Sequence, residues 1–211
     1  MLIGTKAMII AAFGTSLTHQ AGWLKPLEEE LTRCLEAPVR ILDFGRAGAS
    51  SEWGVTAVEE VIRSGADVIL IEFSNNDASW RKGVSLQRSR ENIRQIVRAI
   101  EEGQPEAKIF LMTMSPAFGL RGWIRLRLDA YYDLYRLLAG ELGVGYIDNR
   151  QSWRNLTKDQ LTSGIPDGEH PLPELAARIL VPTIARAIGG ARCGDPKSSG
   201  LTSLPGRSET S

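Results

Sequence analysis

The chain has 211 residues, of which 43% are hydrophobic and 24% are charged, values ordinary for a single soluble globular domain. Its 25 Lys and Arg residues balance 25 Asp and Glu residues, so the formal net charge is zero. This balance argues against a nucleic-acid partner, because proteins that bind nucleic acids usually carry a clear basic excess.

The first apolar run, residues 7–13, predicts a buried strand. It is short for the hydrophobic region of a signal peptide, and it leads directly into a Gly-Thr-Ser motif that cleavage would destroy. No run approaches the roughly 18 apolar residues that a transmembrane helix needs. We therefore expect a cytoplasmic protein with no transmembrane segment.

Short apolar runs alternate with longer amphipathic stretches along the chain. The runs are nearly continuous, as strands buried on both faces of a parallel sheet should be, and comprise residues 7–12, 39–44, 68–71, 109–112 and 145–147. Apolar residues at helical spacing and helix-end signals predict helices at 26–35, 50–64, 86–100, 128–142 and 173–188. This alternation predicts a three-layer α/β/α fold, flavodoxin-like, with a five-stranded parallel sheet. Periodicity does not give the order of the strands.

We expect one domain over residues 1–190 and a disordered tail over residues 191–211. The tail is rich in Gly, Ser, Pro and Thr and lacks an apolar period. Cys34 falls in a predicted helix and Cys193 in the tail, and neither belongs to a Cys-x-x-Cys or Cys/His pattern. The cysteines are therefore expected to be unpaired thiols, and no metal site is expected.

Polar residues and glycines follow the predicted strands. In an open parallel sheet, ligands bind beyond the carboxyl ends of the strands, near the switch in strand order. Alone, each motif is commonly a turn, a loop glycine or a helix cap. Four of them occur in order along the chain: Gly14-Thr15-Ser16, a loop with Gly48, Ser74-Asn75-Asn76-Asp77, and Asp167-Gly168-Glu169-His170-Pro171.

Together these motifs resemble the conserved blocks of the SGNH (GDSL-type) hydrolase family. The first block, usually Gly-Asp-Ser, has Thr15 in place of Asp, and the third block, Gly-x-Asn-Asp, has Ser74 in place of Gly. The glycine of the second block matches Gly48, and the last block, Asp-x-x-His-Pro, is matched in full by residues 167–171. The resemblance implies a serine esterase without a metal or an organic cofactor.

The resemblance also implies the roles of the site residues. Ser16 attacks the ester carbonyl, His170 takes its proton, and Asp167 orients the imidazole. The backbone N–H groups of Ser16 and Gly48 and the side-chain amide of Asn76 form the oxyanion hole. A glycine at position 48 would let the backbone approach the substrate without a Cβ in the way.

Two residues compete with these assignments. His19 lies three residues after Ser16, but no acidic orienter is obvious for it, so we expect His170 to be the base. Asp148, at the end of the fifth strand, is the alternative orienter, although a strand-end cap is its expected role.

Aromatic and basic residues follow the third and fourth strands. We expect Trp80, Trp123 and Arg121 to bind substrate, with indoles covering the face of a sugar and the guanidinium pairing with an anionic substituent. Two alternatives remain open: the tryptophans pack on the domain beside solvated arginines such as Arg125, or Trp123 and Ile124 contact an anionic membrane surface.

The expected function is hydrolysis of small acyl esters, in particular acetyl esters of a carbohydrate, by a Ser-His-Asp triad through an acyl-enzyme. The partner is then a small-molecule or polysaccharide ester. Alternatives within the class are a lipid or short-chain esterase, a lysophospholipase, a thioesterase, or acyl transfer to a sugar hydroxyl. From another class, the chain could be an inactive binding protein on this scaffold, with Thr15 and Ser74 as the first signs of decay.

Overall fold

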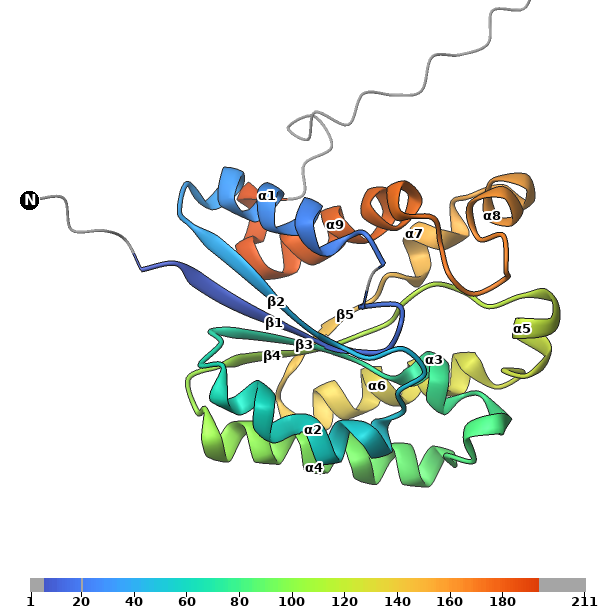
Figure 1. The fold of residues 1–211 in the computed structure, drawn as a ribbon, viewed down its shortest axis with the longest axis horizontal. Coiled ribbons are helices and arrows are strands. Elements are labelled where there is room, and N and C mark those ends of the chain that lie inside the picture. Colours follow the sequence, from blue (N-terminus) through green and yellow to red (C-terminus); the bar gives the residue numbers. More distant parts are fainter. Residues whose placement is uncertain (1–5, 20, 194–211) are drawn as a thin grey trace, which may run out of the picture.

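The computed structural model describes residues 6–19 and 21–193, in which a parallel sheet lies between two layers of helices (Figure 1). The sheet confirms the five predicted strands: β1 (Met8–Gly14), β2 (Val39–Gly45), β3 (Val68–Glu72), β4 (Lys108–Met112) and β5 (Gly145–Ile147). Their order is β2-β1-β3-β4-β5, the flavodoxin-like arrangement. The strand order therefore reverses between β1 and β3, where a ligand crevice is expected.

The apolar side chains of β1 pack into the cores on both faces of the sheet. Successive side chains of a strand point to opposite faces, so Ile10 and Ala12 join one core and Ala11 and Phe13 join the other. All four side chains are fully buried. This explains why the run is continuous rather than alternating.

The five long helices lie where the amphipathic stretches predicted them. One core packs α1 (Leu24–Leu35) and α9 (Pro173–Gly189) on the sheet, and the other packs α2 (Ser51–Arg63), α4 (Leu86–Gly103) and α6 (Leu128–Leu142) (Figure 1). No helix in the described part of the chain is long and apolar enough to cross a membrane.

Six short elements were not predicted. They are α3 (Ser74–Asp77), the 3-10 helix η1 (Trp80–Lys82), α5 (Gly119–Trp123), α7 (Arg150–Arg154), α8 (Lys158–Gly164) and the 3-10 helix η2 (Gly190–Arg192). With three to seven residues each, they are too short to show a helical period. Four of them, α3, η1, α5 and α7, lie in the segments that follow the carboxyl ends of the strands.

Cys34 and Cys193 form a disulfide, so the expectation of two unpaired thiols is wrong. Their Cα atoms are 5.3 Å apart, although 159 residues separate them in sequence. The pairing follows from the packing of α1 beside α9 (Figure 1), which cysteine spacing does not reveal. The fold continues through η2 to the buried Cys193 rather than ending at residue 190. The rest of the predicted tail lies outside the described residues.

Candidate active site

Ser16 lies in the turn that follows β1, at the switch in strand order. The backbone N–H groups of Thr18 and His19 both donate to the carbonyl oxygen of Thr15, at 3.1 and 2.9 Å. The Ser16 Oγ atom lies 2.8 Å from Nε2 of His170, 154 residues further along the chain. The loop before α9 thus folds back over the sheet and brings the predicted nucleophile and base together.

Asp167 holds the other side of the His170 ring. Its Oδ2 lies 2.7 Å from His170 Nδ1, and its Oδ1 accepts the backbone N–H groups of Glu169 and His170 at 2.9 and 2.7 Å. Burial alone would raise the pKa of the Asp167 carboxyl, but the hydrogen bonds from His170 and Glu169 lower it to about 2. An ionised Asp167 favours the hydrogen on Nδ1, which leaves Nε2 free to accept the Ser16 proton.

His19 does have an acidic partner, contrary to the sequence-based argument. Its Nδ1 lies 3.0 Å from Asp43 Oδ2, because Asp43 lies near the end of β2, the strand that pairs with β1. Its ring pairs there, whereas His170 is the histidine hydrogen-bonded to Ser16. Asp148 does not reach either ring: its carboxylate accepts the backbone N–H of Arg150 at 3.0 Å and pairs with the Arg150 guanidinium.

The predicted oxyanion donors lie at the ends of β1, β2 and β3. Among the described residues, nothing accepts the backbone N–H of Ser16 or Gly48. Gly48 has a φ of +73°, and a Cβ there would meet only Lys82 Nζ at 3.5 Å, so the backbone conformation, rather than a close approach, requires glycine. Asn76 is buried and donates through Nδ2 to the carbonyl of Ala49 at 2.7 Å. An amide has two N–H hydrogens, so one remains for an oxyanion.

Arg125 is a residue of the site that sequence reasoning did not find, and the alternative that it is solvated is wrong. It is buried, and its guanidinium forms an ion pair with the equally buried Glu169. Its Nε donates to the carbonyl of Asn75 at 2.8 Å, and its Nη2 donates to Asn76 Oδ1 at 3.3 Å. The pair thus links the loop that carries His170 to the amide of Asn76. The charged pattern of residues 121–127 gave no sign of which arginine points inward.

Arg121 also contacts the loop that carries His170. Its Nη1 lies 3.2 Å from Glu169 Oε2 and its Nη2 lies 3.7 Å from Asp167 Oδ2. The guanidinium predicted to bind an anionic substituent is therefore already paired with carboxylates of the protein.

Trp80 and Trp123 come together from η1 and α5. Their ring centroids are 6.1 Å apart in an edge-to-face arrangement, and they stay 61% and 59% exposed. The tryptophans thus pack on each other and remain available to a partner. Ile124, by contrast, is buried and cannot contribute to a membrane contact.

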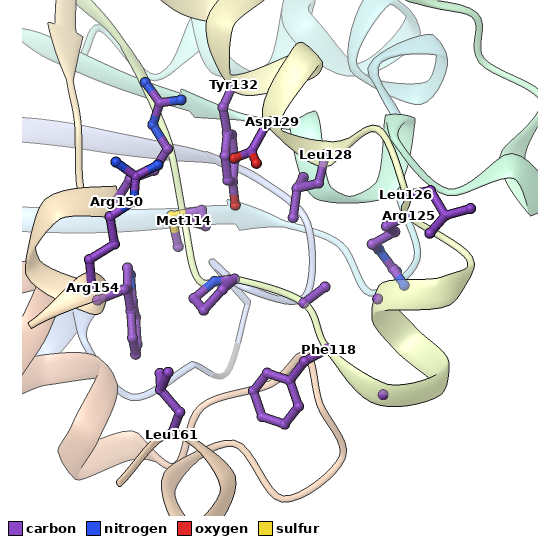
Figure 2. Close-up of a pocket in the computed structure, with 15 residues that line it drawn as sticks. Met114, Phe118, Arg125, Leu126, Leu128, Asp129, Tyr132, Arg150, Arg154 and Leu161 are labelled. Atoms are coloured by element: carbon purple, nitrogen blue, oxygen red, sulfur yellow. The ribbon is translucent and has the colours of Figure 1, made fainter. Parts of the chain in front are cut away.

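A pocket of about 490 Å³ lies at the carboxyl ends of β4 and β5 (Figure 2). Its lining is mostly apolar and includes Met114, Phe118, Leu126, Leu128 and Leu161, with Arg150 and Arg154 along one side. It adjoins the loop that carries Asp167 and His170: the Phe118 backbone N–H donates to the carbonyl of Gly168 at 2.9 Å, and Arg125 contacts both the pocket and Asn76.

A serine lies at the switch point of a flavodoxin-like sheet and is hydrogen-bonded to a histidine that an aspartate holds, an arrangement that serine hydrolases use. The chain belongs to the GDSL-like lipase/acylhydrolase family, whose sequence profile matches residues 11–196. The protein is therefore an SGNH-type esterase or acylhydrolase. A comparison with curated proteins finds no match.

Several solved structures share the fold. Axe2, an acetylxylan esterase from Geobacillus stearothermophilus, is 22% identical, with 92% of this chain and 99% of that chain covered and a TM-score of 0.73. A lipase/acylhydrolase from Enterococcus faecalis is 24% identical, with 87% and 96% covered and a TM-score of 0.73. TesA is 15% identical, with 86% and 98% covered and a TM-score of 0.68. At these identities the likeness concerns the fold alone.

Proposed function

We propose that the protein hydrolyses small acyl esters with Ser16 as nucleophile, His170 as general base and Asp167 as orienting carboxylate. The observation that carries the proposal is the continuous hydrogen-bonded series, 2.8 Å from Ser16 Oγ to His170 Nε2 and 2.7 Å from His170 Nδ1 to Asp167 Oδ2. A serine hydroxyl is a weak nucleophile unless an adjacent base takes its proton as the new bond forms.

The reaction runs through an acyl-enzyme. Ser16 Oγ bonds to the carbonyl carbon while its proton passes to His170 Nε2, and the carbonyl oxygen becomes an oxyanion. The N–H groups of Ser16 and Gly48 and the remaining amide hydrogen of Asn76 would stabilise that charge. His170 then protonates the departing alcohol, and water repeats the sequence to release the acid and restore Ser16.

Asn76→Ala should lower kcat by roughly 10²–10³-fold with a much smaller change in KM, because an oxyanion donor acts mainly in the transition state. The neighbouring Asn75 offers a matched control: it is equally buried, but its amide donates to the carbonyl of Ser115 at 3.1 Å. Asn75→Ala should mainly lower the thermal midpoint, and it should lower kcat much less than Asn76→Ala does. Steady-state kinetics and thermal unfolding of both variants test this, and a purely structural effect of Asn76→Ala would remove Asn76 from the oxyanion hole.

For the substrate, we propose an O-acetylated carbohydrate. The exposed indoles of Trp80 and Trp123 support this choice, since indole faces cover the apolar C–H face of a sugar ring. Arg121 would assist only by exchanging a protein carboxylate for a substrate anion.

Trp123→Ala should raise KM for an acetylated oligosaccharide several-fold while leaving KM for p-nitrophenyl acetate nearly unchanged, because only the larger substrate reaches the indole. Leu137→Ala is the control, because it truncates an exposed apolar side chain on a different helix, α6. It should change the KM for neither substrate. Equal effects of Trp123→Ala on both substrates would count against a sugar platform.

The apolar pocket of Figure 2 favours a second candidate, an esterase or thioesterase for longer acyl chains. A series of p-nitrophenyl esters separates the two. Acetate should be turned over fastest if the first proposal holds. If kcat/KM instead climbs from acetate to octanoate, and Leu161→Trp abolishes that climb by filling the pocket, the carbohydrate proposal should be dropped.

The Cys34–Cys193 disulfide bears on the expected cytoplasmic location. Disulfides persist in oxidising compartments and are rare in the cytosol, where thiols are kept reduced. The bond therefore favours an oxidising compartment over the cytoplasm that the sequence suggested. Trapping of thiols in intact cells before lysis tests this, because it records whether the pair is oxidised where the protein resides.

A further inference from the structure

Glu72 is a fully buried carboxylate directly beneath the turn that carries Ser16. It is the last residue of β3. Its Oε1 accepts the backbone N–H of Thr15 at 2.6 Å and the hydroxyl of Thr18 at 2.8 Å. The Thr15 hydroxyl lies 3.0 and 3.2 Å from its two oxygens. Among the described residues, every donor to this carboxylate thus belongs to Thr15 or Thr18, on either side of Ser16.

Glu72 holds this position at an energetic disadvantage. No Lys, Arg or His among the described residues pairs with it, and a buried charge without a counter-ion is unfavourable. Burial, with a smaller contribution from the nearby Asp77, raises the pKa of Glu72 to about 7, even though the hydrogen bonds from Thr15 and Thr18 lower it. The other titratable groups that face it are Tyr132 and Tyr135 of α6. A neutral side chain of similar size would avoid the desolvation of a carboxylate, so stability alone does not account for a glutamate here.

The first block is shaped around this carboxylate. A Cβ on Gly14 would lie 2.3 Å from Glu72 Oε1, so only glycine leaves it room. Thr15, which stands where the family pattern has Asp, provides two of the hydrogen-bond donors. An Asp side chain at position 15 would instead face Glu72 with a second buried carboxylate, and two such groups repel each other.

We propose that Glu72 is the positioning residue of the nucleophile turn, and that it supplies from β3 the carboxylate that the first block lacks at position 15. By holding Thr15 and Thr18, it sets the direction of the Ser16 hydroxyl toward His170 and of the Ser16 N–H toward the substrate. The inference rests on the proposed role of Ser16. It also explains the Thr15 departure as a compensated exchange rather than as decay of the site.

The first test truncates the carboxylate and follows kcat and KM for p-nitrophenyl acetate. Glu72→Ala should lower kcat by about 10²-fold and change KM less than about 3-fold, because a misplaced reacting group loses rate rather than affinity. Glu72→Gln keeps the shape and one acceptor oxygen and should stay within about 10-fold of the wild-type kcat. The rate at which a fluorophosphonate modifies Ser16 should follow kcat in each variant.

Thr113→Val is the structural control. Thr113 is buried just after β4, a strand that β3 separates from β1, and its hydroxyl accepts the backbone N–H of Asn149 at 2.8 Å. Its loss should lower the thermal midpoint but leave kcat of the folded protein unchanged. If Glu72→Ala behaves in the same way, Glu72 is merely structural and the inference is overturned.

The second test moves the carboxylate and does not depend on Glu72→Ala folding. Thr15→Asp alone should lower kcat by about 10²-fold, since it places two carboxylates in contact. Adding Glu72→Gln should restore kcat to within about 10-fold of wild type, a strongly non-additive result. Losses that multiply in the double variant would overturn the inference. If the wild type is no more active than Ser16→Ala, the proposed function itself is overturned. If the wild type is active and the Glu72 variants have the same kcat, only the inference is overturned.

Discussion

Ser16→Ala should lower kcat/KM for p-nitrophenyl acetate by roughly 10⁴-fold or more, because covalent catalysis is impossible without the hydroxyl and only the oxyanion hole and binding remain. The thermal midpoint should change little. The Ser16 side chain is only partly buried, and its hydroxyl makes a single contact with another side chain, His170.

Labelling with a fluorophosphonate gives a second readout that needs no substrate. The wild type should carry one adduct on Ser16, and Ser16→Ala should carry none. Ser152→Ala is the matched control: within the described part of the chain its hydroxyl hydrogen-bonds only Thr183, at 3.4 Å, so activity and labelling should be unchanged. More than a few per cent of wild-type activity in Ser16→Ala would refute Ser16 as nucleophile.

His170→Ala should match Ser16→Ala in severity, while His19→Ala should keep most of the activity. Both rings have an aspartate partner, at 2.7 Å for His170 and 3.0 Å for His19. Only Nε2 of His170 lies within hydrogen-bond distance of Ser16 Oγ. Since proton transfer needs that contact, the effects of the two substitutions should differ by orders of magnitude.

The double variant Ser16→Ala/His170→Ala sharpens this comparison. When two residues act as one unit, removing either of them already removes the contribution of both. The double variant should therefore be no slower than either single variant. Kinetics on all three proteins test this. If His19→Ala is the inactive variant and His170→Ala the active one, both the base and the role of Asp167 are wrong.

The elements that the sequence determined are those with a pattern inside one segment. Five apolar runs became five strands, and the stretch 128–142 became α6 with the same bounds. The pattern of apolar residues within a strand or a long helix shows which of its faces are buried, because those faces must be apolar to pack in the core. The four motifs were found because each lies directly after a strand or before a helix.

Only the tertiary structure decided which residues meet across segments. The Cys34–Cys193 bond, the pairing of His19 with Asp43 and the burial of Arg125 against Glu169 all join separate parts of the chain. Such contacts depend on the order of the strands in the sheet. The hydrophobic period of each segment is the same for every order, so the sequence pattern does not predict them. Glu72 shows the limit most clearly. In the sequence it is one charged residue after an apolar run, and its place under the Ser16 turn follows only from β3 lying beside β1.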